Sequence, residues 1–359
     1  MSLETPSEFQ PPSAISESAP DEMAIDLSPL ISPRKIGDTV VPAIGLGVMG
    51  IAAAYGTFDT DEERLQVLDA AYRTGCTFWD TADVYGDSED LIGEWFRRNP
   101  EKRSRVFLAT KFAITMTGVR GDAAYVKEAC NQSLQRLGVD YIDLYYQHRV
   151  DRTTPIEKTV AAMAELVHEG KVRHLGLSDC TADGLRRANA IHPIAALQIE
   201  FSPLALEVEK PHLDLVQTAR SLGTKIIAYS PLGRGFLTGH IRSLDDLDSD
   251  DFRLTIPKLS RQNFPKILEL TEKIAEVGRK HSATAGQATL AWTLEQGDDF
   301  FVIPGVKKVK HLLENIGAAN VELTSEDISR IREAAEETKI LGDRYGRGID
   351  MVYVDSPPL

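Results

Sequence analysis

Four ionisable side chains stand at the ends of short apolar runs, where they could act together on a proton. They are Asp80 after Thr77-Phe78-Trp79, Tyr85 in the segment that follows, Lys111 after Val106 to Thr110, and His148 after Tyr145-Tyr146-Gln147. Taken singly, each has a structural explanation as a helix cap, a solvated cation, a packed imidazole or a packed phenol. Taken together, they have the residue types that general acid–base catalysis needs.

Carbonyl reduction is the chemistry that this combination suits best. Hydride addition to a carbonyl leaves an alkoxide that needs a proton, and a phenol with a pKa of about 10 is a poor acid near neutral pH. The Lys111 ammonium would lower the pKa of Tyr85, and a buried Asp80 would keep that ammonium charged and oriented. His148 could donate a hydrogen bond to the carbonyl oxygen, as a neutral imidazole beside the Lys111 cation.

The elements that must position these side chains alternate as short strands and longer helical segments from Arg34 onward. The expected strands are Ala43 to Val48, Thr77 to Asp80, Val106 to Thr110, Tyr141 to Tyr146, Val172 to Leu177, Ala195 to Phe201, Lys225 to Tyr229 and Phe300 to Ile303. Eight strand-and-helix pairs without a linker predict an α/β fold, a single (β/α)8 TIM barrel with catalytic groups at the C-terminal strand ends. An open Rossmann sheet is the alternative, but Gly45-Leu46-Gly47-Val48-Met49-Gly50 lacks its GxGxxG spacing.

Capping motifs mark the starts of three helices. Each has a hydroxyl followed three residues later by a carboxylate, in Thr60-Asp61-Glu62-Glu63, Thr154-Pro155-Ile156-Glu157 and Thr324-Ser325-Glu326-Asp327. The third opens an extra C-terminal helix. A short hairpin is expected at Ile36 to Val40 before the barrel, and the long Gly- and Asp-rich connection from Ser230 to Gln262 is of the kind that is functional or disordered.

Composition limits the possible binding partners of the protein and its expected cellular compartment. The formal net charge of −14 over 359 residues disfavours nucleic acid, because phosphate binding needs a basic face. Residues 1–33 predict a disordered tail, since Met1 to Ser32 lack Lys and Arg and resemble no targeting signal. The barrel is expected over 34–340 and a C-terminal tail over 341–359. No apolar run suggests a membrane span, and three scattered cysteines suggest neither disulfides nor a metal, so we expect a cytoplasmic protein with a small-molecule partner.

Several segments resemble successive motifs of the aldo-keto reductase family. They are Asp80-Thr81-Ala82-Asp83-Val84-Tyr85-Gly86, Ala109-Thr110-Lys111-Phe112, Ser133 to His148, Gly176-Leu177-Ser178 and Tyr229-Ser230-Pro231-Leu232-Gly233. They occur in the family's order from about Arg34 to the C-terminal helix. Gln147 to Asp151 and Arg234 to Gly239 are most similar to the fungal and plant branch with aryl-alcohol dehydrogenase-like and pyridoxal reductase-like enzymes.

The resemblance implies reversible, NADPH-dependent reduction of an aldehyde or ketone. Asp80, Tyr85, Lys111 and His148 match the catalytic tetrad, with Tyr85 as the general acid. Ser178, Asp179 and Gln198 match the positions that hold the nicotinamide carboxamide, Tyr229 matches the residue that stacks on the nicotinamide, and Ser230, Leu232, Gly233 and Arg234 begin the loop over the pyrophosphate. Asp179 stands where the family often has Asn, and a carboxylate cannot donate to an amide.

The segment after the eighth strand resembles the family's adenosine-phosphate segment. Its expected NADPH/NADP+ contacts are Gly305, Lys307, Lys308, His311, Glu314 and Asn315, whereas Val306 replaces a small hydroxyl residue. Lysines at a helix start oppose the macrodipole unless an anion binds there, so this cluster favours a bound 2′-phosphate over a solvated helix face. Which lysine makes the contact stays open.

Two other functions remain open on the same barrel. It could bind the cofactor as a regulatory or interaction module, or perform phosphate-sugar chemistry, which needs a phosphate grip but not the Tyr85 and Lys111 pair. Tyr55, Phe112, Arg149 and the Gly235 to Arg261 loop are expected to shape the substrate pocket. These side chains define neither the physiological substrate nor the oligomeric state.

Overall fold

Eight parallel strands form a closed barrel in this computed structural model, which describes residues 31–52, 59–346 and 352–359. In sheet order the strands are β3 (Leu46–Gly47), β4 (Phe78–Asp80), β5 (Phe107–Phe112), β8 (Ile142–Gln147), β9 (Val172–Ser178), β10 (Ile194–Glu200), β11 (Lys225–Tyr229) and β12 (Phe300–Val302). Parallel bridges from Ile44 to Val302 and from Gly47 to Gly305 join the first strand segment to the eighth. Closure confirms the predicted TIM barrel and excludes the open Rossmann sheet.

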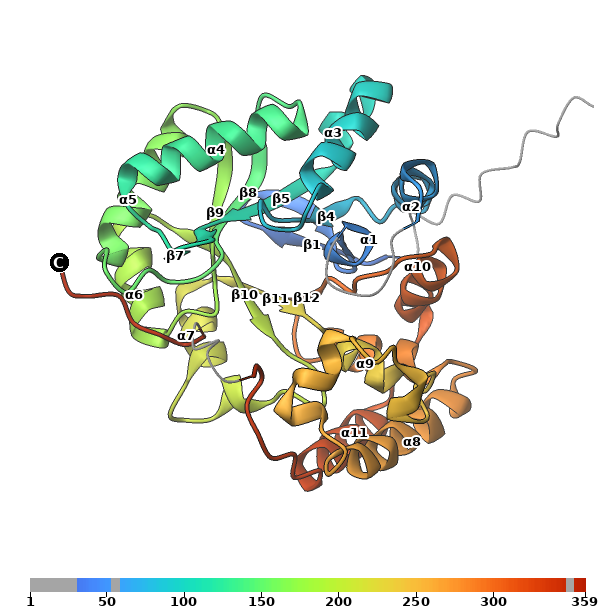
Figure 1. The fold of residues 1–359 in the computed structure, drawn as a ribbon. Coiled ribbons are helices and arrows are strands. Elements are labelled where there is room, and N and C mark those ends of the chain that lie inside the picture. Colours follow the sequence, from blue (N-terminus) through green and yellow to red (C-terminus); the bar gives the residue numbers. More distant parts are fainter. Residues whose placement is uncertain (1–30, 53–58, 347–351) are drawn as a thin grey trace, which may run out of the picture.

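Helices surround the strands, as Figure 1 shows. Those that follow successive strands are α2 (Asp61–Arg73), α3 (Ser88–Arg98), α4 (Ala123–Leu137), α5 (Ile156–His168), α6 (Ala182–Ile191), α7 (Leu215–Leu222), α9 (Ala285–Leu294) and α10 (Val309–Ile316). Further helices are α1 (Met49–Ala52), α8 (Phe264–Lys280) and the expected C-terminal α11 (Ser325–Glu337). Short 3-10 turns are η1 (Pro100–Arg105), η2 (Glu207–Glu209) and η7 (Gly317–Asn320). A small hairpin is formed by β6 (Ile114–Thr115) and β7 (Gly118–Val119). No helix within the described ranges is long and apolar enough to cross a membrane.

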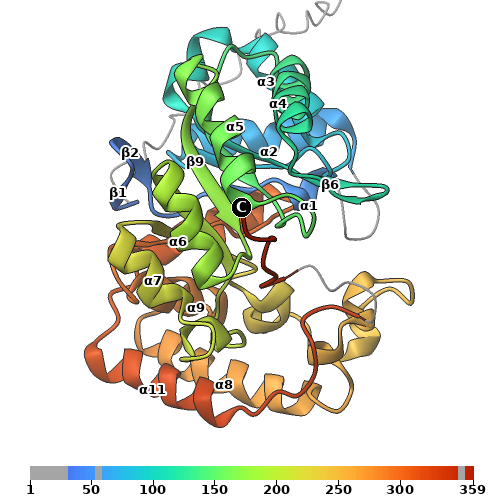
Figure 2. The ribbon, with the colours of Figure 1, turned by 90° about the vertical axis from the view of Figure 1, so that its left-hand side faces the viewer.

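The predicted hairpin closes the end of the barrel where the strands begin. Its strands, β1 (Pro33–Ile36) and β2 (Thr39–Pro42), are antiparallel and lie at the left of Figure 2. The Arg34 guanidinium donates to the carbonyl of Gly297 at 2.8 Å, and Ile36 and Val41 are fully buried in the cluster that fills the barrel interior. The opposite end, where the strands finish, is therefore the one that can hold a site. Of the predicted tail, residues 1–30 lie outside the described ranges.

Two of the three predicted helix caps are confirmed and one is wrong. Thr60 and Thr324 form capping boxes at the starts of α2 and α11. The helix α5 instead begins at Ile156, with Pro155 as its N-cap and without a side-chain cap bond. The Thr154 hydroxyl donates to the Asp151 carboxylate at 2.8 Å and lies one residue before the N-cap, so the helix begins one residue later than the capping motif predicts.

The long connection after β11 is folded. It contains η3 (Gly233–Thr238), η4 (Leu244–Asp246), η5 (Phe252–Thr255) and η6 (Pro257–Leu259). Its apolar side chains, including Phe236, Ile241 and Ile256, form a separate cluster with Phe264 and Ile267 of α8. This small core holds the connection as a wall beside the strand ends.

The segment after α11 returns along the barrel to α6, next to which Figure 1 places the C-terminus. On the way, Arg344 and Tyr345 lie at the ends of the strands. The Arg187 guanidinium of α6 then donates to the carbonyl of Pro357 at 2.7 Å. The described part of the expected C-terminal tail thus packs on the barrel and contributes to its open end.

Candidate active site and cofactor cavity

Adjacent strands bring the predicted catalytic residues together. Asp80 ends β4 and pairs in register with Ala109 of β5. Lys111 lies two residues after Ala109 on the same strand. His148 follows β8, and its amide donates to the Phe112 carbonyl at 2.8 Å. Since parallel strands end at one face of the barrel, residues that are far apart in the sequence meet there.

The Lys111 ammonium is the centre of this group. It donates to the carboxylate of Asp80, to the carbonyl of Thr81 at 2.8 Å and to the hydroxyl of Tyr85 at 3.5 Å. Lys111 is fully buried and Asp80 is 2% exposed, so the ion pair is desolvated. The second oxygen of Asp80 accepts from the Gln198 amide at 2.7 Å, which fixes the carboxylate from the other side.

Burial and charge act in opposite directions on these groups. Burial raises the pKa of the Asp80 carboxyl, whereas Lys111 and the Gln198 bond lower it. For Lys111, burial lowers the pKa, but Asp80 and Tyr85 outweigh it and hold the ammonium charged. The pKa of Tyr85 lies above its ordinary value, because burial outweighs the lowering by Lys111. Lys111 thus lowers the pKa of Tyr85 as expected, but burial has the larger effect, and the phenol keeps its proton at neutral pH.

His148 is neutral in this environment. Burial lowers the pKa of its imidazole well below the usual value, and the Arg149 and Lys111 cations add to that effect. The ring meets Tyr85 edge to face, with 5.7 Å between centroids. Its Nδ1 atom is buried and has no hydrogen-bond partner among the described residues. A neutral imidazole at the cavity wall can donate one hydrogen bond to a ligand.

A cavity of about 840 Å³ extends from these residues to α10. Asp80, Tyr85 and His148 line one end, with Lys111 directly behind them. Twelve of the predicted cofactor residues also line it, namely Ser178, Gln198, Tyr229, Ser230, Leu232, Arg234, Gly305, Lys307, Lys308, His311, Glu314 and Asn315. Asp179 and Gly233 do not. Most of the site residues predicted from the sequence therefore line a single cavity.

Gly233 shapes the turn behind the cavity wall. Its φ of 55° is left-handed, and a Cβ atom there would lie 2.8 Å from Leu204 Cδ1. Its amide donates to the Ser230 carbonyl at 2.9 Å, so this amide is used within the turn. Ser230 and Arg234 also have positive φ values, of 48° and 59°, which non-glycine residues adopt mainly where the surrounding structure imposes them.

The far end of the cavity carries basic groups at the start of α10. Lys307 and Lys308 both line it, and Lys310 does not. The Lys308 ammonium donates to the Asp59 carboxylate at 2.8 Å, so this cation already has an anionic partner. Lys308 is also the N-cap of α10 and provides no capping side chain, which leaves the helix start suited to an anion.

The sequence profile of the aldo/keto reductase family matches residues 43–336, which include all the predicted site residues. The chain belongs to this family.

Relatives and solved structures agree with that assignment. Aldo-keto reductase str7 of Strobilurus tenacellus is 59% identical over 331 residues, which cover 91% of this chain and 98% of that protein. Aldo-keto reductase yakc of Schizosaccharomyces pombe, whose name specifies NADP(+), is 44% identical over 338 residues, with coverages of 92% and 99%. A glycerol dehydrogenase structure from Gluconobacter oxydans superposes with a TM-score of 0.76 at 25% identity, over 85% of this chain and 95% of that one.

Asp179, where the family often has Asn, belongs to a buried charge network. Its carboxylate binds Arg344 at 3.0 Å and Arg149 at 3.2 Å, and it accepts from the Tyr229 hydroxyl at 2.8 Å. Two arginines thus occupy the carboxylate that was expected to meet the nicotinamide carboxamide. The network instead fixes the phenol end of Tyr229, whose ring forms part of the cavity wall.

Sequence reasoning missed Arg344 and Tyr345. Tyr345 lines the cavity, and its hydroxyl accepts from Arg149 at 3.4 Å. The available signal was an arginine and a tyrosine beside each other in a segment assigned as a tail. The chain returns across the strand ends, so Tyr345 reaches the cavity and Arg344 binds Asp179.

The predicted substrate-pocket residues have three different outcomes. Phe112 faces the helices and stacks on Tyr145 with 4.9 Å between centroids, because alternate residues of a strand point to opposite sides and Lys111 points inward. Arg149 and the loop after Gly235 do line the cavity. Tyr55 lies outside the described residues.

Proposed function

We propose that this chain reversibly reduces an aldehyde or a ketone to the alcohol, with NADPH as cofactor and Tyr85 as proton donor. The observation that carries the proposal is the Lys111 ammonium, which contacts the Tyr85 hydroxyl at one end of the cavity. A packed tyrosine needs no buried ion pair behind its hydroxyl. A proton donor does, because the phenolate that forms must be stabilised.

The cavity fits a dinucleotide in size and in charge. Its volume of about 840 Å³ is near the upper end of the range for ligand pockets, about 300–1,000 Å³. Ser178, Gln198 and Tyr229 would hold the nicotinamide end, and Lys307 with the start of α10 would hold the adenosine phosphate. When bound, NADPH would supply the hydride that adds to the carbonyl carbon.

Side chains of the protein would orient the carbonyl, donate the proton and stabilise the phenolate that forms. His148 donates to the carbonyl oxygen and orients it, and this donation strengthens as negative charge develops there. Tyr85 gives its proton to the same oxygen, and the Lys111 ammonium stabilises the phenolate. Asp80, held by Gln198, keeps Lys111 in place. In the alcohol-oxidising direction the proton returns to Tyr85 along the same contact.

Lys307 and Lys308 are the candidates for the 2′-phosphate contact that selects NADPH. Both line the cavity, and the Lys308 ammonium also donates to Asp59. A charge-assisted hydrogen bond contributes about 1.5–3 kcal/mol, so one such contact distinguishes the two cofactors by more than about tenfold. The name of the Schizosaccharomyces pombe relative supports NADP(H) over NAD(H).

Turnover of an aromatic aldehyde tests the proposal. The purified full chain is mixed with NADPH and the aldehyde, and consumption of NADPH is followed by absorbance while the alcohol is quantified by chromatography. We expect the two amounts to be equal, with slower turnover when NADH replaces NADPH. Tight NADPH binding without consumption, across a panel of aldehydes and ketones, would instead identify a cofactor-binding regulatory module.

A further inference from the structure

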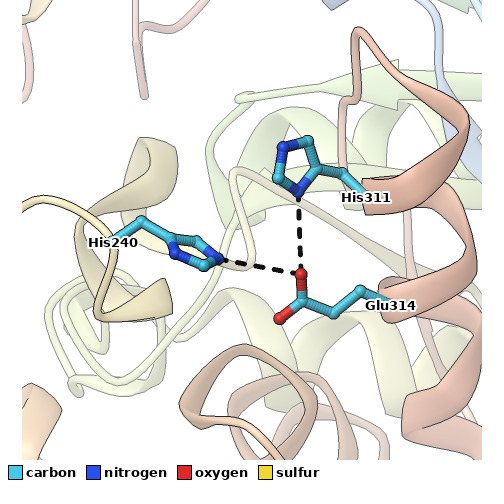
Figure 3. Close-up of side chains that lie close together, drawn as sticks. All are labelled: His240, His311 and Glu314. Carbon is cyan, nitrogen blue, oxygen red and sulfur yellow. Dashed lines mark ion pairs between the residues drawn. The ribbon is translucent and has the colours of Figure 1, made fainter.

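Two imidazoles and a carboxylate meet where the connection after β11 approaches α10. His240 follows η3 in that connection, and His311 and Glu314 lie one turn apart on α10. Figure 3 shows both rings with a nitrogen directed at Glu314. His240 Nε2 lies 3.8 Å and His311 Nδ1 lies 3.6 Å from the same oxygen, Oε2 of Glu314.

These separations suit a shared metal ion better than direct hydrogen bonds. Hydrogen bonds between nitrogen and oxygen are about 2.7–3.2 Å long. In a tetrahedral zinc site, with metal–ligand distances of about 2.0–2.2 Å, neighbouring ligand atoms lie about 3.4 Å apart. In this cluster the three ligand atoms all lie within 4.8 Å of one another, which is close enough for small side-chain rotations to bring them to a common ion.

We propose that His240, His311 and Glu314 bind a divalent transition-metal ion such as Zn²⁺, with water in the fourth position. Two imidazoles and one carboxylate form a ligand set of the type that zinc uses when one position stays open. The nitrogen ligands disfavour Mg²⁺ and Ca²⁺, which prefer oxygen. The sequence expectation of no metal rested on cysteine spacing, and His240 and His311 are too far apart in the sequence to form a recognisable motif.

The side chains are accessible to an ion from solvent. The exposed fractions are 59% for His240, 47% for His311 and 19% for Glu314. Exposure lets the imidazole of His240 rotate to shorten the longest separation. It also means that replacement of either histidine removes little buried surface, so the variants should fold.

A bound metal would join the connection after β11 to α10 and would occupy His311 and Glu314. Both residues line the cofactor cavity at its adenosine end. The metal and the adenosine phosphate of NADPH should therefore compete. This consequence rests on the proposed function, whereas the metal site itself does not.

Titration of the metal-stripped full chain with Zn²⁺ tests the site without cofactor. Calorimetry at slightly alkaline pH, where free imidazoles are neutral, should show one tight equivalent. His240→Ala and Glu314→Gln should each weaken this binding at least about tenfold, because each removes one of three ligands. His212→Ala, which removes an exposed histidine elsewhere, should leave it unchanged. The same isotherm for wild type and His240→Ala would overturn the site.

Cobalt gives a spectroscopic check on the same variants. Co²⁺ bound to the three side chains should show visible absorption bands whose intensity reports a low coordination number. His240→Ala should lose these bands. Bands that persist in His240→Ala would place the metal elsewhere and overturn the proposal.

Fluorescence titration with NADPH tests the competition. Zn²⁺ at a concentration that saturates the wild-type site but not the weakened site of His240→Ala should raise the Kd for NADPH in wild type and leave it unchanged in His240→Ala. An unchanged Kd for the wild-type protein with Zn²⁺ bound would overturn the competition. If NADPH does not bind even without metal, the proposed function fails, and the zinc isotherm still decides the site.

Discussion

The Lys111 ammonium lies 3.5 Å from the Tyr85 hydroxyl and binds the Asp80 carboxylate as well. Burial holds the pKa of Tyr85 above its ordinary value, so the phenol keeps its proton at neutral pH. The ammonium therefore stabilises negative charge on Tyr85 mainly after the proton has left. This relationship suits Tyr85 to the proposed role of proton donor in carbonyl reduction, because the phenolate that forms would be stabilised.

Lys111→Met should decrease kcat by about 10²- to 10⁴-fold, because Tyr85 loses the cation that stabilises its phenolate. It should also destabilise the fold by about 3–5 kcal/mol, since Asp80 is left as an unpaired buried carboxylate. Urea denaturation measures the second effect. In Lys111→Met/Asp80→Asn we expect recovered stability without recovered turnover. A fully active Lys111→Met protein would contradict the proposed role of Lys111 in stabilising the Tyr85 phenolate.

His148→Gln should keep part of the wild-type kcat, because its amide can still donate to the carbonyl oxygen. His148→Ala should lose much more. Since burial and two cations hold the pKa of His148 well below the usual value, the ring stays neutral and its titration should not appear in the rate profile near neutral pH. Steady-state kinetics of both variants against pH checks this, and equal activities would exclude hydrogen-bond donation.

Asp83 should make stability depend on pH. Burial and the neighbouring Glu89 raise the pKa of its carboxyl to about 7. The unfolded value is about 3.9, so between these values the folded state binds more protons and stability falls as pH rises. Asp83→Asn should flatten this part of the curve. Melting temperatures from about pH 5 to 8 measure the effect, with exposed Asp140→Asn as the control; a slope that survives in Asp83→Asn would assign it to another group.

Replacement of Lys307 and Lys308 together by Met should raise the Kd for NADPH at least about tenfold and change that for NADH little. Lys308→Met alone should raise the Kd for NADPH less than the double replacement does, because the Lys308 ammonium already donates to Asp59. Added salt should weaken NADPH binding preferentially. Fluorescence titration with both cofactors measures these changes, and Lys310→Met is the matched control outside the cavity. Equal losses for both cofactors would mean that the lysines act on the shared pyrophosphate or on folding.

The barrel and most of the site could be predicted because their signals are local. Asp80, Lys111 and His148 each end an apolar run, and parallel strands deliver such residues to one face. The net direction of the Tyr85 pKa shift could not be predicted from the sequence, because burial is a property of the packed structure. The role of Asp179 was equally hidden, since its partner Arg344 comes from a segment far along the chain.

Local sequence patterns also misled at two positions. The sequence Thr154-Pro155-Ile156-Glu157 has the composition of a capping box, but α5 begins one residue later, with Pro155 as its N-cap and no side-chain cap bond. Phe112 was expected to shape the substrate pocket, but strand alternation turns it outward, opposite to Lys111. The cluster of His240, His311 and Glu314 left no sequence signal, because its members are brought together only when the connection after β11 packs near α10.

Tyr85→Phe is the most direct test of the central claim that this tyrosine is the proton donor. The change removes one hydroxyl and keeps the ring, so the Kd for NADPH should stay near the wild-type value while kcat falls by about 10²- to 10⁴-fold. Parallel measurement of NADPH binding by fluorescence and of aldehyde reduction by absorbance gives both numbers. A Tyr85→Phe protein with near-wild-type kcat would contradict the account.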